Sequence, residues 1–295
     1  MGKKLTYSAI GLALVLGIGL LFYPSISSWY NAQYQIDAVV GYDNTVQNTS
    51  QETMQEELEK AEAYNEALTG SGITDPFVPG SGVMLPQNYD SILNINSGIM
   101  GTVLIPEIDV SLPIYHGTSE GVLKKGVGHM QMTAFPIGGT GNHAVLTGHT
   151  GMPNTTLFTD LDKLQIGSRF YIQFYRETHA YEVDQIIVVE PSETNELRPI
   201  PGKDFVTLIT CTPYGINSHR LFVRGIRVPY ENEEAEAVAG QKNDSGGLHI
   251  TYDLIIAVCA LALVIIVLVT ALVLRHKKIK QQTEKLMKHR VHRHE

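Results

Sequence analysis

The sequence reads Phe205-Val206-Thr207-Leu208-Ile209-Thr210-Cys211, then Thr212-Pro213-Tyr214-Gly215-Ile216-Asn217-Ser218, then His219-Arg220-Leu221-Phe222-Val223-Arg224. The first and last parts are rich in β-branched and aromatic residues, and the middle part contains the turn formers Pro, Gly and Asn. We therefore expect a hairpin in which Arg220 returns close to Cys211. Arg224 would lie roughly 13 Å further along at ~3.3 Å per residue. A surface hairpin with an incidental thiol fits this spacing equally well.

Further β-rich runs surround this hairpin between residues 98 and 230. They cover residues 102–105, 144–147, 169–175, 181–189, 205–210 and 221–228 and are separated by turn residues. Six or more short strands at such intervals predict a mainly β domain, either an antiparallel sandwich or a closed barrel. Residues 155–164 are compatible with one short helix.

A helical pattern precedes the β-rich region. In residues 34–68 the clearer half starts at Thr49-Ser50-Gln51-Glu52, which has the form of a capping box, and Gly70 supplies a stop signal. Apolar residues then recur every three or four positions, which predicts an amphipathic helix with one buried face: Met54, Leu58, Ala61, Tyr64 and Leu68. Residues 24–70 are thus an N-terminal helical region. Residues 71–97 are rich in Gly, Pro, Ser and Asn and predict a linker or a long ordered loop.

An uncharged run near each end of the chain predicts a membrane span. Residues 5–23 and 254–274 carry no charge, and each run is long enough to cross a bilayer as a helix of ~20 residues. Basic residues flank both runs, so residues 1–23 and 254–274 are expected to span the membrane with both termini in the cytoplasm and residues 24–253 outside. A cleaved signal peptide is the alternative for the first run. Residues 231–253 would be an acidic tether and residues 275–295 a basic cytoplasmic tail.

Composition narrows the possible partners. Hydrophobic residues make up 43% of the 295 positions, which excludes a wholly disordered or collagen-like chain. Residues 24–250 carry 12 basic and 27 acidic side chains. A nucleic-acid partner is therefore not expected, because nothing in this acidic centre neutralises a phosphate backbone.

Only a few residues in the exported part, residues 24–253, are candidates for a catalytic role. Cys211 is its single thiol, which is an accident, a point of intermolecular pairing or a nucleophile. His149 follows a β-rich run in a Gly-flanked loop, where a side chain can face a cleft, although His143 and His219 compete for the role of base. The histidines are scattered, so we expect no metal site and no cofactor.

The motifs around the cysteine resemble those of a known family. Thr207-Leu208-Ile209-Thr210-Cys211 is similar to the Thr-Leu-x-Thr-Cys signature of sortases, the cysteine transpeptidases of Gram-positive surfaces. The nine-residue step to Arg220 resembles the class C, pilin-polymerising branch. Three further segments also look like that branch: Leu112-Pro113-Ile114-Tyr115-His116-Gly117-Thr118, Gly126-Val127-Gly128-His129 and Leu157-Phe158-Thr159-Asp160-Leu161-Asp162.

This resemblance implies a closed eight-stranded sortase-type β-barrel with N-terminal helices, flanked by two transmembrane helices. It makes Cys211 the nucleophile, His149 the general acid and base, and Arg220 the stabiliser of substrate and oxyanion. Asp75-Pro76-Phe77 looks like the class C lid, in which Asp75 would pair with the arginine and Phe77 would cover the thiol. Thr150 departs from the pattern, because many class C members have Arg after the histidine.

The activity implied is that of a thiol transpeptidase at the cell membrane. It would cleave an LPxTG-like sorting signal and join pilin subunits through a lysine isopeptide bond. Two alternatives remain: a housekeeping sortase that attaches surface proteins to the cell wall, and a non-catalytic membrane-tethered scaffold.

Overall fold

The computed structural model describes residues 2–68, 77, 88–95, 98–152 and 155–230, together with residues 264, 275, 278, 279, 281 and 282. The chain divides into two units, one of residues 26–247 and one of residues 1–25 with 248–295. The barrel and its site belong to the first unit.

Within the described residues, eight strands close into a barrel in the order β1-β2-β3-β4-β7-β8-β6-β5. Neighbours are antiparallel except β2 with β3 and β4 with β7, which are parallel. The strands are β1 (Ile99–Ile105), β2 (Val110–His116), β3 (Val127–His129), β4 (His143–Thr147), β5 (Arg169–Phe174), β6 (Glu177–Val189), β7 (Phe205–Thr212) and β8 (His219–Val228). The predicted closed eight-stranded barrel is therefore confirmed, and the sandwich is excluded.

Short helical turns connect the strands. They are η1 (Tyr89–Ser91), η2 (Pro106–Ile108), α3 (Glu120–Leu123), η3 (Leu161–Lys163) and η4 (Asn195–Leu197). The helix expected at residues 155–164 is thus reduced to turns and the three residues of η3.

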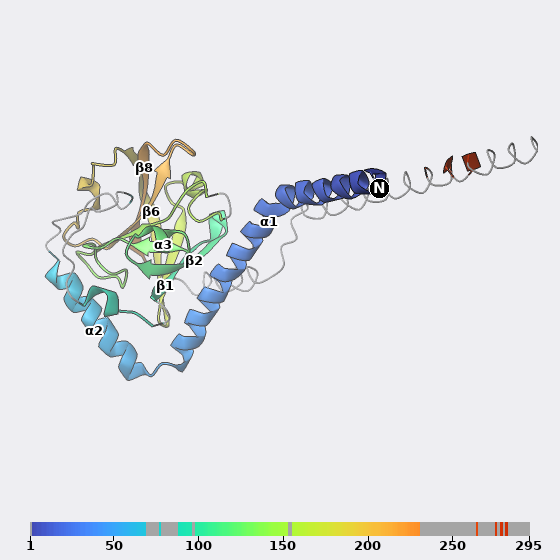
Figure 1. The fold of residues 1–295 in the computed structure, drawn as a ribbon. Helices are drawn as coiled ribbons and strands as arrows, with labels where there is room; N and C mark the ends of the chain where they lie inside the picture. Colours follow the sequence, from blue (N-terminus) through green and yellow to red (C-terminus); the bar gives the residue numbers. More distant parts are fainter. Residues whose placement is uncertain are drawn as a thin grey trace, which may run out of the picture. The chain divides into compact units, whose positions relative to one another are not determined.

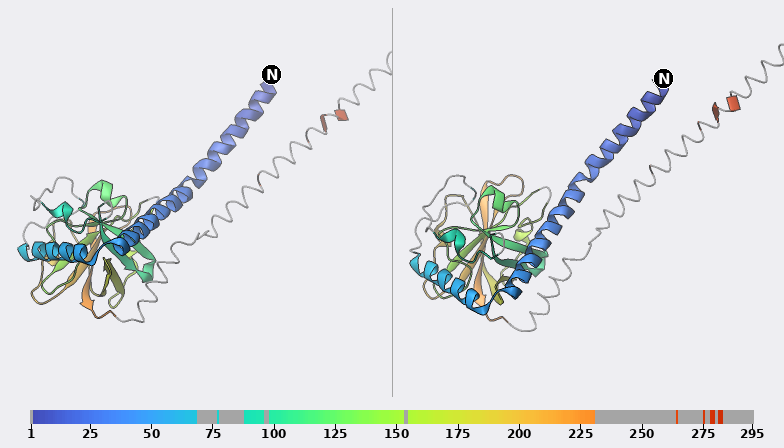
Figure 2. Two further views of the ribbon diagram at one scale, coloured as in Figure 1. Left: turned by 90° about the horizontal axis from the view of Figure 1, so that it is seen from below. Right: turned by 60° about the horizontal axis from the view of Figure 1, so that its bottom comes forward.

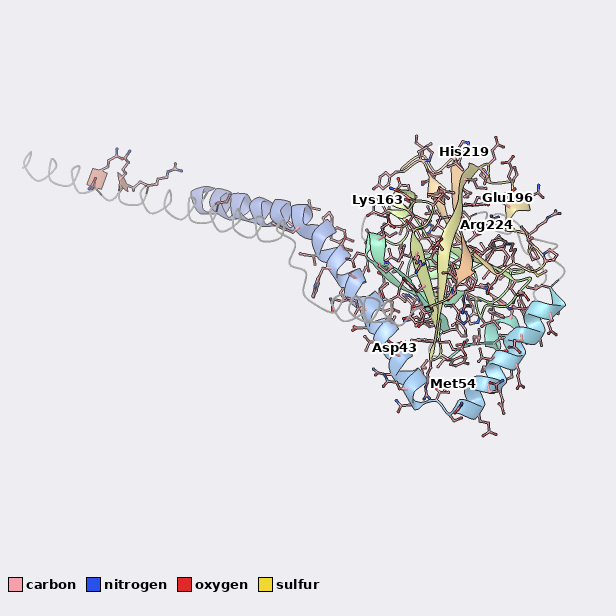
Figure 3. The ribbon with its side chains drawn as sticks, turned by 180° about the vertical axis from the view of Figure 1, so that it is seen from behind. Asp43, Met54, Lys163, Glu196, His219 and Arg224 are labelled. Atoms are coloured by element: carbon pink, nitrogen blue, oxygen red, sulfur yellow. The ribbon has the colours of Figure 1, made fainter. Side chains whose placement is uncertain are left out.

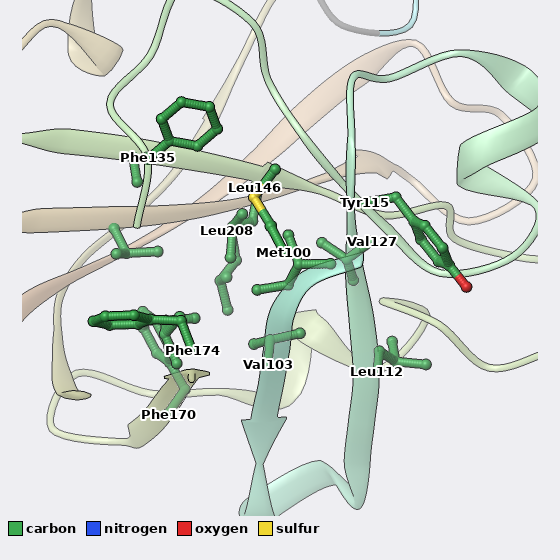
Figure 4. Close-up of a cluster of buried hydrophobic side chains, with 14 of the residues drawn as sticks. Met100, Val103, Leu112, Tyr115, Val127, Phe135, Leu146, Phe170, Phe174 and Leu208 are labelled. Carbon is green, nitrogen blue, oxygen red and sulfur yellow. The ribbon is translucent and has the colours of Figure 1, made fainter. Parts of the chain in front are cut away.

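The barrel interior is an apolar core. Side chains such as Val103, Leu146 and Leu208 are completely buried there, together with the ring of Phe170 (Figure 4). Each large apolar side chain withdrawn from water contributes roughly 1.5–3 kcal/mol to folding. Because the interior is filled, the barrel holds its strand ends in fixed positions.

Residues 26–48 of the first N-terminal helix and the whole of the second pack on the outside of the barrel (Figures 1 and 2). The first, α1 (Gly2–Asn48), buries Val39, Tyr42 and Val46, and the Tyr42 hydroxyl donates to the Met100 carbonyl at 3.2 Å. The second, α2 (Gln51–Ala67), buries Asn65, whose side chain donates to the Phe135 carbonyl and accepts from the Phe135 N–H. These bonds fix the helix that leads into residues 69–87.

The N-terminus of α2 lies one residue later than its capping box predicts. Ser50, not Thr49, is the N-cap, and its Oγ accepts from the Thr53 N–H at 3.1 Å. Thr49 instead donates its hydroxyl to the Thr45 carbonyl of α1. Of the predicted buried stripe, Met54, Ala61 and Tyr64 are buried. The predicted stop signal, Gly70, lies outside the described residues.

The predicted membrane spans are not confirmed. Among the residues that the structure describes, no helix combines the length and the apolar character needed to cross a membrane. The backbone of residues 5–23 is helical within α1, while residues 254–274 lie outside the described part of the chain except for Val264.

Candidate active site

The β7–β8 hairpin brings Cys211 and Arg220 together. Cys211 is directly opposite Arg220 in the register of the two strands, and Thr212 opposite His219 closes the pair. Opposed residues of an antiparallel pair have Cβ atoms about 4.5–5.5 Å apart. The expected proximity of this thiol and this guanidinium is therefore present. Cys211 is half-buried, so its sulfur is neither locked in the core nor fully in water.

Arg224 is separate, as its spacing predicts. It is opposite Thr207 and makes two hydrogen bonds to the Asp184 carboxylate, each of 2.9 Å. Figure 3 shows His219 at the loop end of β8 and Arg224 further along the strand. Of these two arginines, only Arg220 is opposite the cysteine.

The Arg220 side chain is held in place by its surroundings. It is only 7% exposed, and its Nη1 donates to the carbonyls of Asn217 and His219 at 3.2 and 3.1 Å. Its Cζ lies 4.9 Å from the centre of the Phe77 ring, within the range of a cation–π contact. A buried guanidinium with fixed partners is preorganised for a negative charge that develops beside the thiol.

His149 is positioned by the parallel pairing of β4 and β7. Thr147, the last residue of β4, is opposite Ile209 of β7. His149 is two residues past Thr147, and Cys211 is two residues past Ile209. Neighbouring strands lie about 4.8 Å apart. Because β4 and β7 are parallel, His149 and Cys211 therefore follow a paired position by the same number of residues and at the same edge of the sheet.

The turn into the histidine loop is fixed by backbone contacts. The Gly148 N–H donates to the Ile209 carbonyl at 3.0 Å, and the Thr210 hydroxyl donates to the Gly148 carbonyl at 2.8 Å. A Cβ on Gly148 would lie 2.7 Å from the Phe158 ring, so no larger residue fits there without movement. This positioning role of Thr210 is not evident from the sequence, because nothing local to residues 207–211 reveals the parallel neighbour.

The electrostatic surroundings favour a neutral His149. Burial lowers the pKa of its half-buried imidazole, while the opposite charges of Glu120 and Lys124 act on it in opposite directions. Glu120 begins α3 and forms an ion pair with Lys124. A neutral ring can accept a proton from a thiol. The proximity of Glu120 to His149 is a second feature that local sequence reasoning did not reveal.

The two competing histidines differ from His149. His143 lies at the opposite end of β4, is 3% exposed and bonds the Arg198 carbonyl and the Thr207 hydroxyl. It is therefore a structural residue away from the thiol. His219 is opposite Thr212 at the hairpin end, and its Nδ1 lies 2.8 Å from the Ser218 Oγ.

Phe77 lies over this group of residues. Its ring centre is 5.7 Å from that of His149, and the ring packs beside a buried apolar cluster. The cluster consists of Met130, Val145, Leu197, Ile209 and Phe222. The predicted position of the aromatic residue near the thiol hairpin is consistent with these contacts. The other predicted lid residue, Asp75, lies outside the described residues.

Metal binding is not supported by the part of the chain that the structure describes. No group of three or more His, Cys, Asp or Glu side chains there is arranged to hold an ion. The candidate groups that the sequence predicts for this site are a thiol, an imidazole and a guanidinium.

Comparison with known proteins identifies the family. The Sortase domain matches residues 103–228. Sortase A of Streptococcus agalactiae is 29% identical over 120 residues, which are 40% of this chain and 48% of that protein. Sortase A of Bacillus anthracis is 31% identical over 127 residues, which are 43% of this chain and 59% of that protein. The chain thus spans about half the length of these curated relatives.

Solved structures match more of the chain. Sortase C-1 of Streptococcus pneumoniae is 42% identical with a TM-score of 0.63, covering 66% of this chain and 100% of that one. Sortase C-1 of Actinomyces oris is 48% identical with a TM-score of 0.58, covering 61% of this chain and 99% of that one. The chain therefore belongs to the sortase family, in its class C branch. Members of this family are cysteine transpeptidases.

Proposed function

We propose that this protein is a membrane-anchored cysteine transpeptidase that cleaves an LPxTG-like sorting signal and joins pilin subunits through a lysine isopeptide bond. The observation that carries the proposal is the register of three adjacent strands. Cys211 is opposite Arg220, and His149 follows the end of the neighbouring strand β4 by two residues, as Cys211 follows the paired Ile209 of β7. A thiol, a base and an oxyanion donor at one edge are the parts that acyl transfer through a thioester requires.

In the first half-reaction the Cys211 sulfur attacks the carbonyl carbon of the Thr–Gly bond, and the thiol proton passes to His149. The carbonyl oxygen becomes negative and is stabilised by the Arg220 guanidinium and by backbone N–H groups. The C–N bond then breaks, and His149 returns the proton to the leaving glycine amine. The threonine carbonyl remains on Cys211 as a thioester.

In the second half-reaction a lysine side-chain amine of the next pilin subunit attacks the thioester. The amine loses a proton to His149, the C–S bond breaks, and the sulfur leaves as a thiolate that takes the proton back. The product is an isopeptide bond between the two subunits, and the enzyme is restored.

Phe77 supports the pilin branch over a housekeeping role. Its ring contacts both His149 and Arg220, so the resting site is covered by a residue from the segment between α2 and β1. We infer that residues 75–77 form a lid, with Asp75 paired to Arg220 when it is closed. A solved neighbour described as the pilus-related sortase C of Group B Streptococcus is 41% identical with a TM-score of 0.60.

We also propose where the protein resides. Residues 5–23 and 254–274 would span the cell membrane, with the barrel outside and both termini in the cytoplasm. The uncharged runs and their basic flanks support this topology. Protease treatment of intact cells should remove the barrel but leave the terminal segments. Protection of the barrel would contradict it.

The test of the function is incubation of the purified protein with candidate pilins, followed by mass spectrometry of the products. We expect a peptide in which a threonine carbonyl of one subunit is linked to a lysine of another, and none with Cys211→Ala. Attachment to a peptidoglycan-precursor amine instead would indicate the housekeeping reaction. Absence of any product with all candidates would favour the scaffold.

A further inference from the structure

Helix α1 exposes a stripe of large apolar side chains. Ile26, Trp29, Tyr30 and Tyr34 are 56%, 49%, 66% and 48% exposed, respectively. They follow one another at steps of three, one and four residues, which places them on one side of a helix with 3.6 residues per turn. We call these four residues the aromatic stripe.

The opposite side of the same helix contacts the barrel. Gln35, Val39, Tyr42 and Val46 are buried, and their spacing of four, three and four residues places them roughly opposite the aromatic stripe. The stripe is therefore not a packing face for the barrel. Four large side chains remain exposed on the outer side of a helix whose inner side is already occupied.

The sequence around the stripe indicates what covers it. No charged side chain occurs between Lys4 and Asp37, although a membrane span needs only about 20 residues. The uncharged run thus extends past the predicted span and through the stripe, ending at Ile36, two residues after Tyr34. Tryptophan and tyrosine are also the residues that membrane–water interfaces favour, since their rings are apolar and carry a polar atom.

We propose that the aromatic stripe lies in the headgroup layer of the membrane and turns one defined side of the protein toward it. This inference rests on the membrane anchoring proposed above. A helix that left the bilayer upright would meet lipid on every side, whereas a one-sided stripe requires the helix to lean with that side down. Pro24, just before the stripe, removes a backbone hydrogen bond and permits a change of direction.

The orientation has a consequence for the proposed reaction. Gln35, next to the end of the stripe, donates to the Thr155 hydroxyl at 3.1 Å and to the Lys125 carbonyl at 3.4 Å. Lys125 follows Lys124, whose charge acts on His149. Gln35 thus attaches the helix that carries the stripe to the segment after α3, and a bilayer against the stripe would give the barrel one defined orientation toward a membrane-held sorting signal.

The chain offers a direct probe, because Trp29 is its single tryptophan. The full-length protein would be reconstituted in phosphatidylcholine–phosphatidylglycerol vesicles that contain lipids brominated either near the glycerol end or near the terminal methyl of the acyl chain. We expect several-fold stronger quenching of Trp29 by the shallow bromines than by the deep ones, and weak quenching by aqueous iodide. Strong iodide quenching without bromolipid quenching would overturn the proposal.

Matched variants sharpen the test. Tyr30→Ser with Tyr34→Ser should increase iodide quenching of Trp29, whereas Ile166→Ser, which alters a 64% exposed residue on the barrel, should not. Equal quenching in all three proteins would contradict the proposal. A second copy of the protein would instead be covering the stripe if Trp29 were shielded from iodide but not quenched by bromolipids, and if this shielding grew with protein density. That result would also overturn the proposal. Cys211→Ala should behave like the parent, so the outcome is independent of the proposed catalysis.

Discussion

Of the side chains at the site, Arg220 is the one whose contacts leave the least room for substitution. Its planar guanidinium donates to two carbonyls and stacks on Phe77 while being almost completely buried. A lysine keeps the charge but supplies neither the fork nor the stacking plane.

We therefore expect Arg220→Lys to lower kcat/KM for a sorting-signal peptide by about 10²-fold, the scale of one oxyanion donor. The matched control is Arg224→Lys, which changes an arginine on the same strand that bonds Asp184. Its kcat/KM should stay close to that of the parent. An equal loss of kcat/KM in the two variants would contradict this expectation. It would show that the loss comes from the charge or the stability of β8 and not from the position of the arginine beside Cys211.

Phe77 provides a second prediction at this scale. Its ring lies against His149 and Arg220, so removing it should open access to Cys211. Phe77→Ala is expected to react several-fold faster with a methanethiosulfonate probe, and Asp75→Ala combined with it faster still. Ile166→Ala, which removes a 64% exposed side chain on the barrel, should leave the labelling rate unchanged. An unchanged labelling rate in both Phe77→Ala and the double variant would contradict the lid.

At the scale of elements, β4 and β7 are joined by a buried histidine as well as by their backbones. His143 at the start of β4 lies 2.7 Å from the Thr207 hydroxyl of β7, and burial lowers its pKa to about 4. An unfolded histidine has a pKa of about 6.5, so between these values the unfolded chain binds a proton that the folded protein does not. Stability from this group is complete above about pH 6.5 and is lost as the pH falls towards 4, by up to about 3 kcal/mol.

His143→Gln should flatten this dependence. We expect the variant to be less stable than the parent at neutral pH, and the difference in free energy of unfolding to shrink as the pH is lowered to about 4. Urea unfolding at a series of pH values measures both. Parallel losses in the two proteins would mean that His143 does not carry the effect. Burial also lowers the pKa of His129 and of His179 to about 3, so some acid sensitivity should persist.

The elements differ in how well the sequence predicts them. The β7–β8 hairpin and the apolar face of α2 follow from local patterns, because strand, turn and helix signals lie within about 20 residues. Neither β2 nor β3 is predicted as a strand: β3 has only three residues, too few to form a pattern, and both lie in or overlap segments that stand out only for their resemblance to the family. The parallel pairing of β4 with β7 joins segments 62 positions apart in register, so the alignment of the loop that carries His149 with the Cys211 end of β7 could not be read from either strand alone.

At the scale of the whole molecule, the barrel and its N-terminal helices act as one support for the site. The Sortase domain match begins at residue 103, yet Phe77 comes from a segment before the barrel and α2 leads into it. The sequence predicted this arrangement only through the resemblance to class C sortases, since a Gly- and Pro-rich segment by itself is more typical of a plain linker. The two hydrogen bonds between Asn65 and Phe135 hold the end of α2, from which the segment with Phe77 starts, against the barrel.

The central claim is that Cys211 forms a thioester with the threonine carbonyl of a sorting signal. Its most direct measurement is the intact mass of the Phe77→Ala protein after rapid mixing with an LPxTG peptide and acid quenching. We predict a mass increase equal to the peptide up to its threonine, located on Cys211 and released by hydroxylamine. A folded protein that gains no such mass, or gains it at another residue, would contradict the account.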